Sequence, residues 1–260
     1  MSSSKKSYLK PPMNYIQIKE NIVHVYADEF QRNRFQIVVA GDPNVGKSTY
    51  LKLMKSNEFD PTRHTTTSMD VVVIYVQILD SLRHAKMVFF DMVGQDINRP
   101  DELEPLIGRS DAVLAFFDAT DETTFESLKR WKQRLDKTIG KGEYQLFVVC
   151  NKIDLLEDEG EALIQRIETW KQRAKDELSA TRFVLISAKS GDNCHELCYE
   201  LAETIFAMRD CIDRTERLTG KTNERMLLRD IPAISKHAVY LDSLGNNQSK
   251  WWKFKWCLLL

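Results

Sequence analysis

The feature that most constrains this chain is the segment Gly41-Asp-Pro-Asn-Val-Gly-Lys-Ser48, which matches the pattern G-x-x-x-x-G-K-[ST]. It follows a short apolar, β-branched run at 35–40, which predicts a buried strand, and it opens a helical pattern at about 48–56. In that setting, backbone N–H groups and a helix N-terminus surround a phosphate group. The segment therefore predicts a P-loop α/β fold and a site for a nucleoside triphosphate.

The residues of this loop have distinct expected tasks. Gly46 allows the backbone to approach the phosphates closely, Lys47 is expected to reach the β- and γ-phosphates, and Ser48 is expected to ligate Mg²⁺. Four neighbours complete the predicted phosphate-binding set: Gly41, Asn44, Val45 and Thr49.

The rest of the chain repeats the alternation of strand and helix. Apolar runs follow at 70–79, 86–90, 112–117, 145–150 and 182–187. Helical patterns lie at about 101–109, 123–138, 160–179 and 194–213. This order predicts a six-stranded, mostly parallel sheet with helices on both faces. The short turn around Asp80 predicts an antiparallel hairpin between the second and third strands, and Thr123 or Thr124 is expected to cap the helix at 123–138.

Charge divides the chain into three parts. Residues 1–34 carry six basic and three acidic side chains, residues 214–260 carry nine and four, and residues 35–213 carry 22 and 31. An acidic middle with basic ends fits a globular domain whose tails meet an anionic surface, although solvated tails without a partner explain the charges as well. We expect an N-terminal extension at 1–34, one domain at 35–213 and a hypervariable tail at 214–260. In the extension, the alternation at 14–28 fits either an added hairpin or an unstructured arm.

Composition argues against several classes of protein. The formal net charge of -1 is unlike that of a histone-like nucleic-acid coat, so we expect no nucleic-acid partner. No run of 18 apolar residues predicts a membrane span, and the N-terminus lacks a secretory pattern. The five cysteines are odd in number and match no zinc spacing, which indicates reduced thiols in the cytosol.

Two further motifs identify the base. Asn151-Lys152-Ile153-Asp154 comes directly after the run at 145–150, and Ser187-Ala188-Lys189 ends the run at 182–187. A carboxylate at such a strand end accepts hydrogen bonds from N1–H and N2–H of guanine. Adenine offers no such pair of donors, so a site of this kind rejects adenine strongly.

Together with Asp91-Met-Val-Gly94-Gln95, these motifs stand in the order GDPNVGKS, DMVGQ, NKID and SAK. Across residues 35–213 the chain resembles the Ras superfamily of small GTPases. The likeness is greatest to the Rab branch, and Rho-like and Ras-like alternatives stay open. The resemblance implies a small monomeric GTPase that binds GTP or GDP with Mg²⁺ and hydrolyses GTP.

The resemblance also implies roles at the base. Asn151 would hold guanine N7, the Lys152 stem would lie against the base, and Asp154 would bind N1 and N2. The Ala188 N–H would bond guanine O6, with two supporting residues: Ser187 and Lys189. Phe59, which lies 18 residues beyond Gly41, stands where the family has an aromatic ring on the base, although an exposed loop phenylalanine is the alternative.

Two switch segments follow from the same resemblance. Asp91 would hold Mg²⁺ through water, the Gly94 N–H would bond the γ-phosphate, and Gln95 would orient the attacking water. In the first switch, the family spacing of 25 residues beyond Gly41 selects Thr66 as the threonine that ligates Mg²⁺. Two neighbours remain possible: Thr65 and Thr67. The expected catalytic set is therefore Gln95, Lys47 and Thr66, and the expected metal set is Ser48, Thr66 and Asp91.

Both switches depart from the usual Rab sequence. Phe90 replaces a common tryptophan, Met92-Val93 replaces Thr-Ala, and Pro100 lies in the second switch. Pro43 occupies a loop position where Ras has glycine, and it would crowd an arginine supplied by an activating protein. Partner identity is therefore less constrained than nucleotide chemistry.

The chain ends in Cys257-Leu-Leu-Leu260, a C-a-a-X box whose final leucine predicts geranylgeranylation of Cys257. Residues 250–256 contain three lysines, four aromatic residues and no acid, a composition that favours an anionic membrane surface. The expected location is the cytoplasmic face of a membrane, with lipid anchorage and a cytosolic pool. An apolar tail that docks on the domain is the alternative.

The leading hypothesis is a monomeric GTP-binding switch in intracellular trafficking or signalling, with an exchange factor, a GTPase-activating protein and effectors as partners. A pseudo-GTPase scaffold that holds nucleotide without cycling is the main rival, and Gln95 argues against it. A translation-factor-like, RNA-linked GTPase is disfavoured by the absent RNA-binding domain and by the C-terminal cysteine box.

Overall fold

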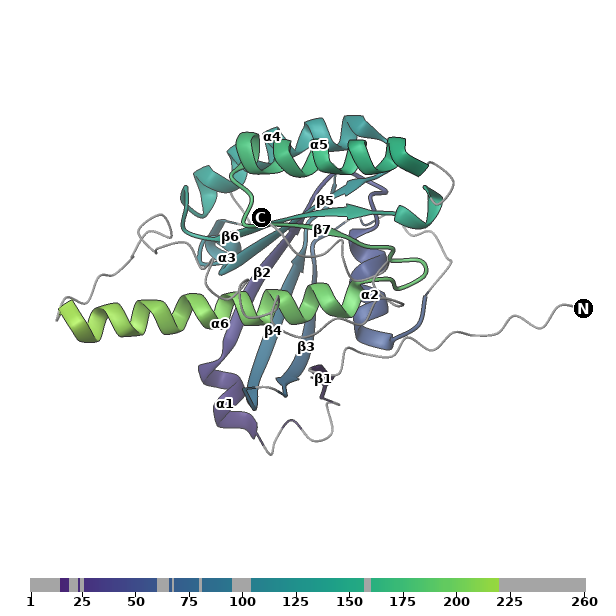
Figure 1. Ribbon diagram of the computed structural model, residues 1–260. Coiled ribbons are helices and arrows are strands. Elements are labelled where there is room, and N and C mark those ends of the chain that lie inside the picture. The colour runs from purple at the N-terminus through teal and green to yellow at the C-terminus, as the bar shows by residue number, and fades with distance from the viewer. Residues whose placement is uncertain are drawn as a thin grey trace, which may run out of the picture.

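A seven-stranded sheet forms the centre of the computed structural model, in the order β1-β3-β4-β2-β5-β6-β7 (Figure 1). Its strands are β1 (Tyr15–Gln17), β2 (Arg34–Ala40), β3 (Asp70–Ile78), β4 (Arg83–Asp91), β5 (Ala112–Asp118), β6 (Gln145–Asn151) and β7 (Arg182–Leu185). The structure describes residues 15–18, 23, 26–59, 66, 68–79, 81–94, 104–156 and 160–219.

The fold confirms the predicted P-loop α/β class. Strands β4, β2, β5, β6 and β7 are parallel neighbours, and β3 pairs with β4 as the expected antiparallel hairpin. All six expected strands are present. A short seventh strand, β1, comes from the segment whose alternation was ambiguous, and it pairs antiparallel with residues 76–78 at the edge of β3.

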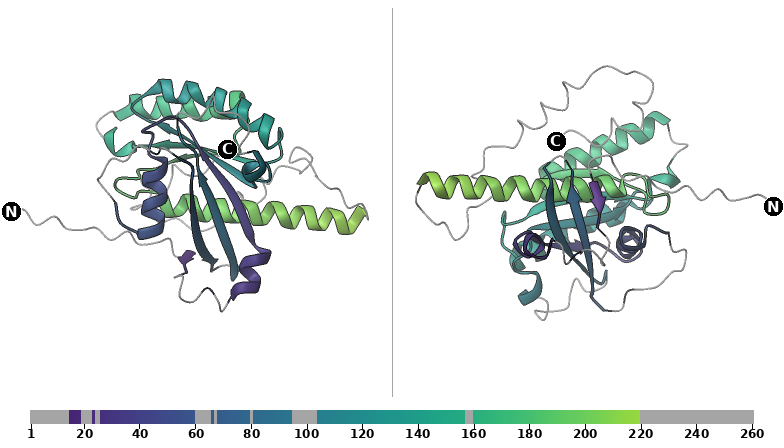
Figure 2. Two further views of the ribbon diagram at one scale, coloured as in Figure 1. Left: turned by 180° about the vertical axis from the view of Figure 1, so that it is seen from behind. Right: turned by 90° about the horizontal axis from the view of Figure 1, so that it is seen from below.

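Helices cover both faces of the sheet (Figures 1 and 2). Their bounds are α1 (Ala27–Arg32), α2 (Lys47–Ser56), α3 (Glu104–Ile107), α4 (Glu122–Thr138), α5 (Gly160–Leu178) and α6 (Cys194–Thr219), with a 3-10 turn at Ile153–Leu155. Helices α4 and α5 lie together on one face, while α2 and α6 cover the other. Helix α6 continues six residues beyond position 213. No described helix has both the length and the hydropathy that crossing a bilayer requires.

Burial on both faces explains why the central strands read as continuous apolar runs. In β2, Ile37 and Val39 pack with α2 and α6, whereas Val38 and Ala40 pack with α4 and α5. A strand covered on both sides needs apolar residues at successive positions instead of alternate ones. The sheet is therefore held rigidly along its length, and the loops at the carboxyl ends of its strands have a fixed base.

The start of α4 corrects one expectation. Asp121, and not Thr123 or Thr124, is the N-cap, and its side chain accepts a hydrogen bond from the Thr123 N–H at 3.0 Å. The Thr124 hydroxyl instead donates to the Asp121 carbonyl oxygen and accepts from the Asp118 N–H. Aspartate is as strong an N-cap as threonine, so the neighbouring carboxylate competes successfully for that position.

Part of the N-terminal extension packs on the domain. Phe30 of α1 is buried and meets the Tyr75 ring edge-on at 4.9 Å. Tyr26 stacks on His84 at 3.9 Å, and His84 Nδ1 lies 2.6 Å from the Glu29 carboxylate. These contacts join the segment before β2 to the β3–β4 hairpin, so residues 26–33 are part of the folded unit.

Helix α6 contains a buried acid that makes stability depend on pH. Burial raises the pKa of Glu200 to about 7; Glu196 adds to the rise and Arg182 opposes it. Its Oε2 atom is buried and has no hydrogen-bond partner among the described residues. Because the folded pKa lies above the unfolded value, the native chain keeps a proton that the unfolded chain loses. The free energy of unfolding therefore falls as pH rises from about 4.5 to about 7.

We expect Glu200→Gln, which cannot ionise, to remove this loss. Its Tm at pH 8 should exceed that of the wild type by about 4 °C, while the difference at pH 4.5 should be small. Calorimetry at both pH values measures this. Glu161→Gln, an exposed substitution on α5, is the control. An equal change in Tm at both pH values would contradict the assignment.

Candidate functional site

The phosphate loop connects the carboxyl end of β2 to the N-terminus of α2. Gly46 has a φ of 95°, and a Cβ atom there would lie 2.1 Å from Nδ2 of Asn151. Gly41 has a φ of 134°, and a Cβ atom there would lie 2.3 Å from the Phe116 carbonyl oxygen. Both positions therefore require glycine for conformation and for space.

Lys47 lies inside this loop. Its side chain is buried, and Nζ donates hydrogen bonds to the carbonyl oxygens of Gly41 and Asp42, each at 2.9 Å. Burial lowers the pKa of Lys47 to about 8, although the nearby carboxylates of Asp91 and Asp42 oppose this effect. The loop thus holds an amine close to the backbone N–H groups that would surround a phosphate.

The residues predicted to ligate Mg²⁺ come together beside Lys47. The Ser48 hydroxyl donates to Asp91 Oδ2 at 2.5 Å and lies 2.8 Å from the Thr66 hydroxyl. Burial raises the pKa of Asp91, and Asp70 adds to the rise while Ser48 and Lys47 oppose it. Asp91 Oδ1 is buried without a hydrogen-bond partner among the described residues.

This donor set fits the implied metal. Mg²⁺ prefers oxygen ligands and commonly takes only one or two carboxylates alongside phosphate oxygens and water. Two hydroxyls and one carboxylate with an unpartnered oxygen meet that requirement. In the described part of the chain, no group of three His, Cys, Asp or Glu side chains could hold a metal by itself.

Gly94 packs directly against the phosphate loop. A Cβ atom at Gly94 would lie 2.4 Å from the Pro43 nitrogen and 2.7 Å from the Asp42 carbonyl carbon. The second switch therefore begins in contact with the first half of the loop. Three residues predicted for the switches lie outside the described residues: Thr65, Thr67 and Gln95.

Asn151 connects the phosphate loop to the base-binding motifs. Its Nδ2 donates to the Val45 carbonyl oxygen at 2.8 Å, and its Oδ1 accepts the Ala188 N–H at 2.9 Å. The side chain is buried. The Ala188 N–H, which the resemblance assigns to guanine O6, thus donates to Asn151 in this structure.

Asp154 is fixed by the third motif. The Ser187 hydroxyl donates to Asp154 Oδ1 at 2.7 Å, and the Lys189 ammonium lies 3.5 Å from Asp154 Oδ2. These contacts orient the carboxylate that was predicted to read guanine.

Lys152 makes an ion pair that the sequence did not indicate. It adopts a φ of 67°, and its ammonium donates to Asp118 Oδ2. Burial would raise the pKa of Asp118, but the bonds from Lys152 and Thr120 outweigh burial and lower it. Asp118 is not among the site residues that the sequence predicts. The missed signal was its position at the end of β5, directly opposite Asn151 in the parallel register.

Three other predicted residues lie in the phosphate loop, in α2 or just after it. The Phe59 side chain is 40% exposed, and its packing on the base stays a prediction. Asn44 is exposed, with a φ of 63°, and Thr49 is half-buried in the first turn of α2.

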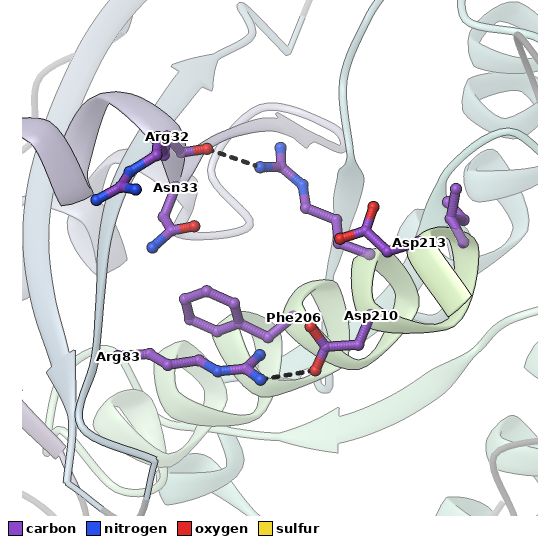
Figure 3. A pocket seen from close by; sticks show the side chains of 8 residues that line it. Arg32, Asn33, Arg83, Phe206, Asp210 and Asp213 are labelled. Atoms are coloured by element: carbon purple, nitrogen blue, oxygen red, sulfur yellow. Dashed lines mark hydrogen bonds and ion pairs between the residues drawn. The ribbon is translucent and has the colours of Figure 1, made fainter. Parts of the chain in front are cut away.

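A hollow of about 410 Å³ lies at the opposite, amino end of the parallel strands (Figure 3). It is lined by Arg32, Asn33, Arg83, Phe206, Arg209, Asp210, Ile212 and Asp213. Arg83 pairs with Asp210 at 2.7 Å, and Arg209 donates to the Arg34 carbonyl oxygen at 2.8 Å. These bonds connect α6 to the start of β4 and β2, and none of the predicted site residues lies there.

Comparison with known proteins agrees with the geometry. The model of the Ras family matches residues 36–207. The Ras-related protein SEC4 of Saccharomyces cerevisiae is 30% identical over 175 residues, covering 65% of this chain and 74% of that protein. The putative Ras-related protein Rab-5B of Dictyostelium discoideum is 31% identical over 173 residues, covering 66% and 75%. The human Ras-related protein Rab-22A is 30% identical over 173 residues, covering 65% and 82%.

The carboxylate of Asp154 gives a test of base selectivity. Asp154→Asn replaces an acceptor for guanine N1–H and N2–H with a group that also donates. We expect GTP affinity to fall about 100-fold, because each lost bond is to a charged acceptor. Affinity for xanthosine triphosphate, whose extra carbonyl accepts a bond, should rise relative to GTP.

Equilibrium titration with fluorescent nucleotides measures both affinities. Asp176→Asn, an exposed substitution on α5, is the control. GTP affinity equal to that of the wild type in Asp154→Asn would show that the base site is wrongly assigned.

Proposed function

Because the chain belongs to the Ras family of small GTPases, within its Rab branch, we propose that it is a membrane-attached switch in intracellular trafficking. In this proposal it hydrolyses GTP to GDP with Mg²⁺ and alternates between the two nucleotide states. Its partners are an exchange factor, a GTPase-activating protein and effectors, and the chain acts as a monomer.

The main observation in support of the proposal is that Ser48, Thr66 and Asp91 lie close together. These residues come from the phosphate loop, the first switch and the end of β4, yet they lie within hydrogen-bonding distance of one another through Ser48. A scaffold that only holds nucleotide does not require a threonine from the switch at the metal position. A GTP-dependent switch does, because that threonine must respond to the γ-phosphate.

The protein's own residues then divide the work of hydrolysis. Lys47 binds the β- and γ-phosphate oxygens as a point charge held within the loop, and the Gly94 N–H donates to the γ-phosphate. Gln95 orients the water for in-line attack. Ser48, Thr66 and Asp91 would hold Mg²⁺, which would supply positive charge at the β- and γ-phosphates.

Guanine recognition uses the second group of residues. Asp154, oriented by Ser187 and Lys189, accepts N1–H and N2–H of the base. Asn151 joins the phosphate loop to the Ala188 backbone, so base and phosphate binding share one rigid support. Lys152, held by Asp118, lays its aliphatic stem along the base.

Regulators meet a surface that differs from that of Ras at Pro43. This residue is exposed and abuts Gly94, where an activating protein's arginine would approach. In contrast, Phe90, Met92 and Val93 are buried in the core. Those three departures therefore alter packing beneath the switch, and among the described departures Pro43 is one that a partner would contact.

Membrane attachment is proposed from the tail, which lies outside the described residues. Cys257 is the prenylation site of the C-a-a-X box, and Lys250, Lys253 and Lys255 supply charge toward an anionic leaflet. A single lipid chain gives only marginal binding, so these lysines are the needed second signal.

Hydrolysis tests the proposed cycle. Gln95→Leu should retain nucleotide and Mg²⁺ affinity but slow single-turnover GTP hydrolysis by about tenfold or more, because the attacking water loses its orientation. Ser48→Asn should weaken Mg²⁺-dependent GTP binding and favour GDP. Unchanged turnover in Gln95→Leu, with or without an activating protein, would favour the scaffold hypothesis.

Fractionation of cells tests the anchor. Cys257→Ser should move the protein to the cytosol, whereas Cys211→Ser, a partly buried thiol of α6, should not. Changing the three lysines to glutamine removes about 1 kcal/mol of attraction each near an anionic leaflet. That variant should bind membranes more weakly, with a reduced dependence on salt, and should still be prenylated.

The docked-tail alternative predicts the opposite pattern. Cys257→Ser would then leave localisation unchanged, and deletion of residues 251–260 would lower Tm. An unaltered membrane fraction for Cys257→Ser would therefore reject the lipid anchor.

A further inference from the structure

We propose that Trp131 is a positioning residue of the nucleotide site, which holds the phosphate loop in place through a hydrogen bond to Asp42 and so prolongs the binding of nucleotide. This inference rests on the proposed function and adds to it a control on nucleotide release from helix α4.

The contact joins two distant parts of the chain. Trp131 lies in the middle of α4, and its side chain is fully buried among the core residues that α4 and α5 share. Its indole Nε1 donates to Asp42 Oδ1 at 3.0 Å. Asp42 belongs to the phosphate loop and lies 89 residues earlier. The bond therefore connects the helical layer on one face of the sheet to the phosphate loop at the carboxyl end of β2.

Asp42 is placed where a small movement would affect the whole phosphate site. Its carbonyl oxygen accepts a hydrogen bond from Lys47 Nζ at 2.9 Å, and its carbonyl carbon lies 2.7 Å from the position of a Cβ on Gly94. The residue thus supports the phosphate-binding lysine and touches the glycine that begins the second switch. Its side-chain Oδ1 accepts the hydrogen bond from Trp131, and its carboxylate also lies near the Lys47 ammonium.

The next residue makes this attachment stiffer. Pro43 fixes its own φ and restricts the backbone of the residue before it, Asp42, to extended conformations. The Asp42–Pro43 unit therefore has few ways to adjust if its side-chain bond is lost. Displacement would move the carbonyl oxygen at Lys47 and the surface against Gly94 together.

A purely structural tryptophan would not need this bond. Trp170 of α5 is nearly as buried as Trp131 and packs edge-on against Phe117 at 5.2 Å. Both rings fill the same core, but the bond to the phosphate loop belongs to Trp131. Substitution of either tryptophan disturbs the packing of the core, but substitution of Trp131 also removes the hydrogen bond to the phosphate loop. The two residues therefore form a matched pair for an experiment.

Release of fluorescent GDP from the full chain in the presence of Mg²⁺ tests the proposal. Trp131→Phe, which keeps a large ring and removes the donor, should release GDP about fivefold faster than the wild type. Asp42→Ala should show a similar increase. The double variant should release GDP no faster than either single one, because the two side chains act through one bond. Asp42→Asn, whose amide oxygen still accepts, should recover most of the lost residence time.

Thermal melting of the same variants distinguishes an effect on the position of the phosphate loop from a general loss of stability. Trp170→Phe should lower Tm as much as Trp131→Phe while leaving GDP release within about twofold of the wild type. Three results would overturn the inference alone: wild-type release in Trp131→Phe, additive effects in the double variant, or equal acceleration in Trp170→Phe. A wild-type chain that binds no fluorescent GDP would overturn the proposed function and this inference with it. Asp42→Ala keeps the test decisive if Trp131→Phe unfolds, because Asp42 lies outside the core.

Discussion

The side-chain amide of Asn151 holds the candidate site together. It donates to the Val45 carbonyl oxygen in the phosphate loop and accepts the Ala188 N–H in the last motif, so one buried group joins three loops. Its closeness also explains why position 46 must be glycine, since a Cβ there would overlap the amide nitrogen. Because the bonds are buried, breaking either would leave an unpaired polar group at a cost of about 1–3 kcal/mol. The base-binding and phosphate-binding halves are thereby coupled.

The positions of the six main strands along the chain were predictable, because each central strand is buried on both faces and reads as an apolar run. The motifs at the ends of these strands were also predictable, since the residue types in the motifs follow from the chemistry of the ligand. The sheet then brings together groups whose meeting the sequence did not indicate. Asp118 lies 34 residues from Lys152, and Asp42 lies 89 residues from Trp131. Neither pair follows a local period, so only the register of β5 with β6 and the packing of α4 reveal them.

Elements near the edges of the fold were harder to predict, for physical reasons. The three-residue β1 pairs with β3 alone, and so short a pattern of alternation does not distinguish a strand from an unstructured arm. Its pairing covers residues 76–78 at an otherwise open sheet edge, a position where proteins commonly limit association between strands. The contacts that Phe30 makes with Tyr75 and His84 explain why α1 packs on the domain. Both partners belong to the β3–β4 hairpin, which follows later in the chain.

Variation in the switch sequences has different consequences according to burial. Phe90, Met92 and Val93 differ from the usual family residues, yet all three are buried, and the volumes of Phe90 and Met92 must fit the core that α4 and α5 share. Pro43 differs at the surface and contacts Gly94 through its backbone. A buried substitution reaches a partner only by moving the backbone, whereas Pro43 alters directly the space beside the γ-phosphate. The phosphate loop, held by Trp131 on one side and limited by Pro43 on the other, is therefore a place where regulation of this chain would diverge from that of Ras.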